Sequence, residues 1–196
     1  MSRRLWRLSA LLTLAGLLAC SHSQPAFRLQ NITGLMPPLK FTLTDQNARL
    51  VSEQDYRGKV VLLYFGYTQC PDVCPTTLAM LREALGRLGA GAAKVRVLFV
   101  SVDPQRDTAA VLKAYMRYFG SEFVGLRGDD AALNALTRRY RVAYHREKPD
   151  PHGYYAVDHS SAIFVFDQKG QARLLAEESA GPTAIASDLQ RLLSSD

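Results

Sequence analysis

Two cysteines four positions apart, Cys70 and Cys74, are the residues of this sequence with the clearest chemical potential. They stand in the run Gly-Tyr-Thr-Gln-Cys-Pro-Asp-Val-Cys-Pro at residues 66–75, and the only other cysteine is Cys20 near the N-terminus. Two such thiols can form a disulfide in one redox state, and as thiolates they can hold a soft metal ion in another. Packing gives no reason for thiols at both ends of a Pro-Asp-Val turn, so two structural core cysteines are the weaker interpretation.

The elements on either side place the cysteines at a strand-to-helix junction. Residues 59–66 form a continuous apolar stretch, typical of a strand that is buried on both faces. Leucines then recur at positions 78, 81, 85 and 88, along one face of an amphipathic helix. Pro75 suits the first helical position, which predicts Cys74 at the N-cap and Cys70 in the preceding loop. The unpaired N–H groups and the positive dipole of a helix start favour a thiolate there.

The remaining pattern predicts an α/β fold. A second apolar strand at residues 95–102 completes a parallel strand-helix-strand unit, and Asp107 and Asp129 are expected to cap the next two helices. Residues 142–154 look like an exposed polar loop, residues 161–167 and 172–177 like a hairpin, and Pro182 opens a closing helix. With a further hairpin over residues 39–50, this order predicts a thioredoxin-like sandwich with an N-terminal β-hairpin extension.

His159 is the third candidate for the site. It stands directly before the strand expected at residues 161–167, in a loop that a thioredoxin-like chain brings beside the cysteine turn. Thioredoxin-type oxidoreductases have a cis-proline at that place, whereas this chain has no proline between Pro151 and Pro182. A lone histidine is more often hydrogen-bonded at a strand end than bound to a metal. Its expected position beside two thiols favours the ligand here.

Two acidic residues are expected near the site. Asp158 would either orient the ring of His159 or be a solvated loop residue. Asp103 ends the second parallel strand, on the carboxyl edge where open α/β sheets usually carry their sites. It would line the rim of the site, contact a partner, or cap the turn before the next helix.

The donor set predicts copper. Two thiolates are soft ligands suited to Cu(I), and an imidazole is a borderline donor that Cu(II) accepts, so the set can hold either oxidation state. A structural zinc site usually has four protein ligands, and only three candidates are present.

The N-terminus resembles an export signal. Basic residues are followed by a short apolar core and by Leu-Leu-Ala-Cys at residues 17–20, which resembles a bacterial lipobox with Cys20 as the lipidated residue. We therefore expect a signal peptide at residues 1–19, a polar tether at residues 20–38 and one domain at residues 39–196, lipid-anchored at the periplasmic face of a bacterial membrane. An ordinary signal cleavage nearby is the alternative. Removing the leader lowers the formal net charge from +6 to +3. The sequence has no cluster of basic residues with interleaved aromatics, so nothing in it indicates nucleic-acid binding.

These features together resemble the Sco/SenC family of copper chaperones for cytochrome oxidase assembly. The likeness covers nearly the whole expected domain: Gly-Lys-Val-Val at residues 58–61, the cysteine run, Ser-Val-Asp-Pro at residues 101–104 with Arg-Asp-Thr at 106–108, and Asp-His-Ser at 158–160. It implies a thioredoxin-like fold and copper bound by Cys70, Cys74 and His159. Gln69, where the family often has histidine, and Ala109, where it often has proline, depart from the pattern.

Three functions are compatible with these residues. The first is a membrane-tethered metallochaperone that receives copper from other carriers and delivers it to the dinuclear copper (CuA) site of a cytochrome c oxidase subunit. The second is an enzyme, a thiol-disulfide oxidoreductase in which Cys70 and Cys74 reduce the cysteines of that copper site. Only the first needs His159. A third, peroxiredoxin-like reading depends on Thr68 alone and is the weakest.

Overall fold

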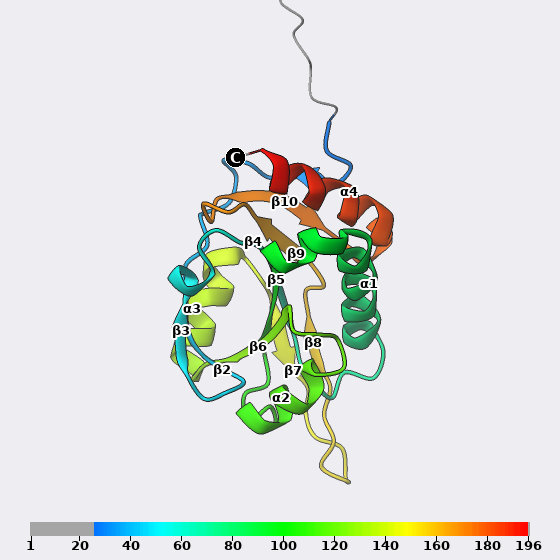
Figure 1. The fold of residues 1–196 in the computed structure, drawn as a ribbon. Helices are drawn as coiled ribbons and strands as arrows, with labels where there is room; N and C mark the ends of the chain where they lie inside the picture. The colour runs from blue at the N-terminus through cyan, green and yellow to red at the C-terminus, as the bar shows by residue number, and fades with distance from the viewer. Residues whose placement is uncertain (1–25, 196) are drawn as a thin grey trace, which may run out of the picture.

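The computed structural model of the protein describes residues 26–195 and is built around one mixed β-sheet (Figure 1). The strands of this sheet are β1 Gln30–Asn31, β2 Thr42–Asp45, β3 Leu50–Ser52, β4 Val60–Gly66, β5 Val95–Ser101, β6 Phe123–Arg127, β9 Ile163–Phe166 and β10 Ala172–Ala176. Their spatial order is β1-β10-β9-β4-β5-β6-β2-β3. Strands β4, β5 and β6 are parallel, and the other neighbouring pairs are antiparallel.

Helices cover both faces of the sheet, which explains why every residue of β4 is buried. These helices are α1 Val73–Arg87, α2 Ala109–Met116, α3 Asp130–Tyr140 and α4 Gly181–Ser194. Tyr140 of α3 packs on Phe164 and Phe166 of β9. These two residues pair with Leu63 and Val61 of β4, so all four lie on the face of the sheet that α3 covers. Tyr64 and Gly66 point to the opposite face, which α1 covers. The predicted α/β sandwich and its parallel strand-helix-strand unit are confirmed.

The N-terminal hairpin is present and belongs to the main sheet. Strands β2 and β3 pair with each other, and β2 also pairs with β6, so the hairpin forms one edge of the eight-stranded sheet. Strand β6, which the sequence pattern did not predict, provides the place where the hairpin attaches. It is short, and Gly125 interrupts its apolar run.

The polar stretch at residues 142–154 is not only a loop. Strand β7, Tyr144–Arg146, lies within it and pairs antiparallel with β8, Val157–His159, in a separate two-stranded sheet. We call these two strands and the residues between them the histidine ribbon. Its strands have three residues each and are mostly exposed or half-buried, so they have neither the length nor the alternation that marks a strand in a sequence. In Figure 1 the ribbon projects from the end of the molecule opposite α4.

Of the two predicted N-cap residues, the one for α3 is confirmed and the one for α2 is not. Asp129 is the N-cap of α3, as predicted, and accepts a hydrogen bond from the backbone N–H of Ala132. Asp107 is not the N-cap of α2, contrary to the prediction. The next residue, Thr108, is the N-cap, and its hydroxyl accepts a hydrogen bond from the backbone N–H of Val111. Asp107 is instead fully buried, where its carboxylate accepts hydrogen bonds from other elements.

We expected residues 20–38 to form a tether outside the domain, and for the second half of this segment the prediction is wrong. Strand β1 pairs with β10, and Leu29 and Ile32 on either side of it are buried. One carboxylate oxygen of Asp188 in α4 accepts hydrogen bonds from the backbone N–H groups of Arg28 and Leu29, each 2.8 Å long. The segment therefore packs on the domain, because its two apolar side chains and its N–H groups find partners there. The signal peptide expected at residues 1–19 and the lipid site expected at Cys20 lie outside the described residues.

Within residues 26–195, no helix has both the length and the apolar character needed to cross a bilayer.

Candidate metal centre

The cysteine turn connects β4 to α1, as expected, but the helix begins earlier than predicted. Asp72 is the N-cap, and Cys74 is the second helical residue instead of the N-cap itself. The first backbone hydrogen bond of the helix runs from the N–H of Thr76 to the carbonyl of Asp72, 3.1 Å. Pro75 is then the third helical residue. A proline fits there because it lacks an N–H group, and N–H groups in the first turn have no partner within the helix. Cys70 lies in the preceding loop, as predicted.

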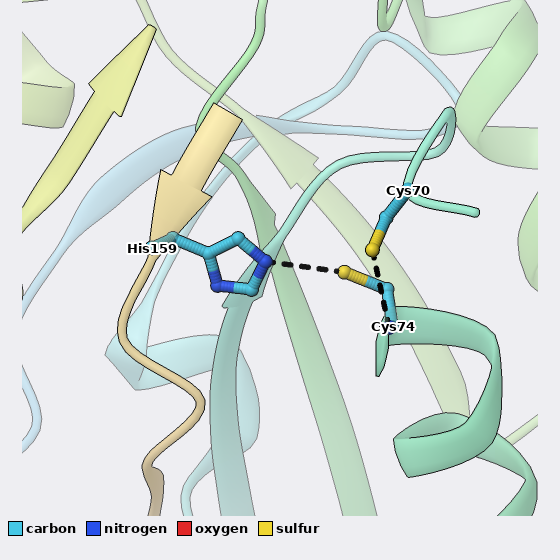
Figure 2. A group of neighbouring side chains, drawn as sticks. All are labelled: Cys70, Cys74 and His159. Atoms are coloured by element: carbon cyan, nitrogen blue, oxygen red, sulfur yellow. Dashed lines mark hydrogen bonds between the residues drawn. The ribbon is translucent and has the colours of Figure 1, made fainter. Parts of the chain in front are cut away.

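The two sulfurs lie close to each other and differ in exposure. Cys74 is fully buried, whereas Cys70 is half-buried, and both are free thiols. The backbone N–H of Cys74 donates to the sulfur of Cys70 at 3.4 Å (Figure 2). The turn therefore presents one accessible and one buried thiol at the same helix start.

Gly66, the last residue of β4, makes room for the buried sulfur. A β-carbon at this position would lie 2.9 Å from the sulfur of Cys74 and 2.6 Å from the ring of Phe99. Both distances are shorter than a carbon atom allows without displacing a neighbour. The glycine at the end of the strand is therefore required by the position of Cys74.

His159 completes the group from a distant part of the chain. Its Nε2 atom lies 3.3 Å from the sulfur of Cys74, and the ligand atoms of Cys70, Cys74 and His159 all lie within 4.8 Å of one another (Figure 2). Among the described residues, no other group of three histidine, cysteine or acidic side chains has this arrangement. The structure thus brings together the three residues singled out from the sequence, although His159 ends β8 and does not lie in a strand-entry loop.

The ring of His159 is oriented by a backbone group. Its Nδ1 atom lies 3.0 Å from the carbonyl oxygen of Ser160. A carbonyl oxygen can only accept a hydrogen bond, so Nδ1 carries the hydrogen and, in the neutral ring, the lone pair of Nε2 points toward the sulfur. Of the two roles expected for Asp158, the structure agrees with the solvated residue and not with the one that orients the ring, because Asp158 is exposed and lies opposite His145 in the ribbon. Two aromatic rings, of Tyr64 and Tyr67, contact the imidazole edge to face.

Burial dominates the electrostatics of the buried thiol. It raises the pKa of Cys74 to about 12, so the metal-free protein holds this residue as a neutral thiol at pH 7. For Cys74 the expectation that the helix start favours a thiolate is therefore wrong, since desolvation outweighs the helix dipole. A metal ion that replaces the thiol proton supplies the positive charge that the site itself lacks.

Asp103 is not part of the rim of the site. It is fully buried, forms ion pairs with Arg106 and with Arg146 at 3.4 Å, and accepts a hydrogen bond from the hydroxyl of Tyr155 at 2.9 Å. The nearby Asp107 carboxylate accepts from the N–H and hydroxyl of Thr68, 3.1 and 2.5 Å, just before the cysteines. Both acids hold segments that carry ligands. The sequence indicated this region only through the Ser-Val-Asp-Pro and Arg-Asp-Thr motifs, without the contacts that these residues make.

The two residues that depart from the family pattern also have defined places. The side-chain oxygen of Gln69 accepts a hydrogen bond from Arg106 at 3.1 Å. Ala109 is the first residue of α2, a position where proline is well tolerated because the N–H has no helical partner. His145 and His152 are exposed and lie outside the three-residue group.

Comparison with known proteins gives the family. The sequence profile of the SCO1/SenC family matches residues 37–194. The chain belongs to the SCO1/SenC family. An SCO2-like protein of Rickettsia felis is 36% identical over 134 residues, which are 67% of this chain and 64% of that protein. The chain thus spans less than two thirds of the length of this relative.

Solved structures of Sco proteins have the same fold. The copper-bound structure of ScoI from Bradyrhizobium japonicum is 40% identical, with a TM-score of 0.73 over 80% of this chain and 99% of that one. The solution structure of apo Sco1 from Thermus thermophilus is 34% identical, with a TM-score of 0.77 over 87% and 99% of the two chains. The predicted thioredoxin-like α/β fold is therefore confirmed.

Proposed function

We propose that this chain is a copper metallochaperone of cytochrome c oxidase assembly, with Cys70, Cys74 and His159 as its copper ligands. The observation that carries the proposal is the convergence of three donor atoms within 4.8 Å. Nitrogen and sulfur donors bind a first-row metal ion such as zinc at about 2.0 to 2.3 Å and so stand at most about 4.6 Å apart, which means that these side chains need move only slightly to share one ion. Two sulfurs and one imidazole nitrogen are donors that copper accepts in both common oxidation states.

Relatives support copper as the cargo. ScoI of Bradyrhizobium japonicum, a SCO1/SenC relative, has been solved with copper bound. Copper is here the cargo that the protein receives and passes on, and the Sco family is a family of cytochrome c oxidase assembly proteins. We propose the CuA site of the oxidase subunit as the acceptor, reached by exchange of ligands between the two proteins.

The chemistry of transfer follows from the asymmetry of the ligands. Cys70 is the accessible donor, so an acceptor thiolate replaces it with the least movement of the protein. Cys74 and His159 then hold the ion until a second acceptor ligand arrives. The protons that the thiols lose on loading return to them when the ion leaves.

Titration of the reduced protein with copper tests this assignment. Wild-type protein should bind one equivalent, and Cys70→Ser and Cys74→Ser should each abolish tight binding. His145→Ala serves as the control, because His145 is an exposed histidine in the same ribbon and is not a ligand. Unchanged stoichiometry and affinity in Cys70→Ser would show that the proposed site is wrong.

A thiol-disulfide oxidoreductase is the second candidate. The difference in exposure between the two sulfurs favours it, because an accessible thiol can attack a target disulfide and a buried neighbour can resolve the mixed disulfide. This reaction uses no imidazole ligand. Full rescue of oxidase assembly by His159→Ala would favour the oxidoreductase over the chaperone.

We also propose that Cys20 carries lipid and anchors the domain at the periplasmic face of a bacterial membrane. The support is the Leu-Leu-Ala-Cys sequence after a short apolar segment. Mass spectrometry of the mature N-terminus should find a lipid mass on wild-type protein and none on Cys20→Ser. A wild-type chain without lipid would refute the anchor and leave the copper site untouched.

A further inference from the structure

Arg106 contacts both segments that carry the proposed ligands. On one side, its Nη1 atom donates to the side-chain oxygen of Gln69, the residue before Cys70, at 3.1 Å. On the other side, its guanidinium lies 3.6 Å from the ring centroid of Tyr155, which precedes β8 in the histidine ribbon. The guanidinium also lies 5.6 Å from the ring of Tyr67, whose edge-to-face partner is the imidazole of His159.

A buried carboxylate holds Arg106 in this place. Its Nε atom forms an ion pair with Asp103, whose side chain is fully buried, and only 16% of the side chain of Arg106 is itself exposed. The same carboxylate accepts the hydroxyl hydrogen of Tyr155 at 2.9 Å and pairs with Arg146 of β7. Asp103 thus ties the cation to one end of the ribbon and, through β5, to the main sheet.

The position of the histidine ribbon depends on such side-chain contacts. Strands β7 and β8 form a sheet of their own, so no ladder of backbone hydrogen bonds fixes them to the eight-stranded sheet. Strand β9, which pairs with β4, begins only at Ile163, four residues after His159, so the distance between His159 and the cysteines also depends on side-chain contacts. Arg106 lies between the two segments and touches both.

We propose that Arg106 is a positioning residue that sets the separation between the cysteine pair and His159. The guanidinium is suited to this role because it lies over the ring of Tyr155 while its N–H groups donate to Asp103 and Gln69 at the same time. A lysine ammonium cannot make these contacts together. The part of this inference that concerns copper rests on the proposed function, whereas the part that concerns the ribbon does not.

Loss of Arg106 should affect the two oxidation states of copper differently. Two thiolates alone can hold Cu(I), so a displaced imidazole costs little there. Cu(II) depends on the imidazole nitrogen as well. A variant that loosens the ribbon should therefore weaken Cu(II) binding selectively, which general destabilisation of the fold would not do.

The test compares Arg106→Met and Arg106→Lys with Arg173→Met. Arg173 is a matched control, because it also pairs with an aspartate, Asp167, at 3.1 Å and also lies over an aromatic ring, that of Phe27. It stands on β10, away from the three donors. Both Arg106 variants should bind Cu(II) about 10- to 100-fold more weakly, the usual effect of removing a group that orients a ligand, and should shift the thiolate-to-Cu(II) absorption band. Cu(I) affinity should change less than about threefold, and Arg173→Met should match wild type in all three measurements.

Hydrogen exchange of the metal-free protein gives a readout that needs no copper. Amides of β7 and β8 should exchange faster in the Arg106 variants than in wild type or Arg173→Met. Tyr155→Leu should reproduce the Cu(II) defect, and adding Arg106→Met to it should cause little further loss, since both changes remove the same contact. Tyr155→Phe keeps the ring and should bind Cu(II) nearly as wild type does.

The outcomes separate the two levels of the proposal. Wild-type protein that binds no copper would refute the proposed function, and exchange in the ribbon would still decide whether Arg106 holds it. Wild-type Cu(II) binding together with wild-type ribbon exchange in Arg106→Met would overturn the positioning role. If Arg106→Met does not fold, Tyr155→Leu decides by the same measurements, and its wild-type behaviour would overturn the proposal.

Discussion

The Nε2 atom of His159 lies 3.3 Å from the sulfur of Cys74, although 85 residues separate the two in the chain. His159 ends a short ribbon strand and Cys74 is the second residue of α1, so the contact joins two elements that do not pair through their backbones. Because the Nδ1–H group of the ring is engaged by the Ser160 carbonyl, the free nitrogen faces the sulfur.

Replacement of His159 by alanine should separate copper delivery from thiol chemistry. The two sulfurs remain, so we expect Cu(I) binding and disulfide reduction to persist, whereas Cu(II) affinity should fall by at least about tenfold. Complementation of an oxidase-deficient strain should fail. Titrations with each copper ion, beside a disulfide reduction assay, measure the effect, and His145→Ala should behave as wild type in all of them. Normal Cu(II) affinity in His159→Ala would contradict the ligand assignment.

Alkylation of the metal-free protein should distinguish the two thiols. The thiolate is the reactive form, and burial raises the pKa of Cys74 to about 12, so its reaction with iodoacetamide at pH 8 should be slow. The rate at Cys74 should rise as the pH increases toward that value, because more thiolate is then present. Peptide mapping should show Cys70 modified first, and denaturant should abolish the difference. Equal rates in the folded protein would contradict the assignment of one accessible and one buried thiol.

Oxidation should block loading with Cu(I). We expect the oxidised protein to contain a Cys70–Cys74 disulfide, which removes both thiolates that supply the soft donors. Mass spectrometry identifies the disulfide, and a Cu(I) competition assay measures uptake before and after reduction. A protein that carries the disulfide and still takes up Cu(I) normally would refute this control by redox state.

Loss of Asp188 should detach the N-terminal segment from the domain. Asp188→Ala removes a buried carboxylate that accepts two backbone hydrogen bonds, so the free energy of unfolding should fall by about 3 kcal/mol. Amides of β1 should also exchange faster. Glu83→Ala, which breaks an exposed ion pair with Arg87, should cost less than about 1 kcal/mol when both variants are measured by urea titration. If Asp188→Ala loses no more than the small amount expected of Glu83→Ala, the contact between Asp188 and the N-terminal segment does not contribute to stability.

The sequence by itself determined the elements whose signals are local and strong. Strand β4 is a continuous apolar run, α1 has leucines along one face, and Asp129 caps α3, so each could be recognised without knowledge of its neighbours. The three proposed ligands were also identifiable, because two thiols at a strand-to-helix junction have few other uses and the expected fold places His159 beside them. Family membership followed from the same motifs.

Only the tertiary structure decided what long-range contacts control. Strands β1, β7 and β8 have two or three residues and exist because they find partners far along the chain or across a long loop. The state of Cys74 depends on burial by several elements at once, which outweighs the local helix dipole. The roles of Asp103, Asp107 and Arg106 depend on contacts with residues 37 to 52 positions away, and no local pattern encodes such distances. The ligands could thus be chosen from the sequence, whereas the contacts that hold them in place required the folded chain.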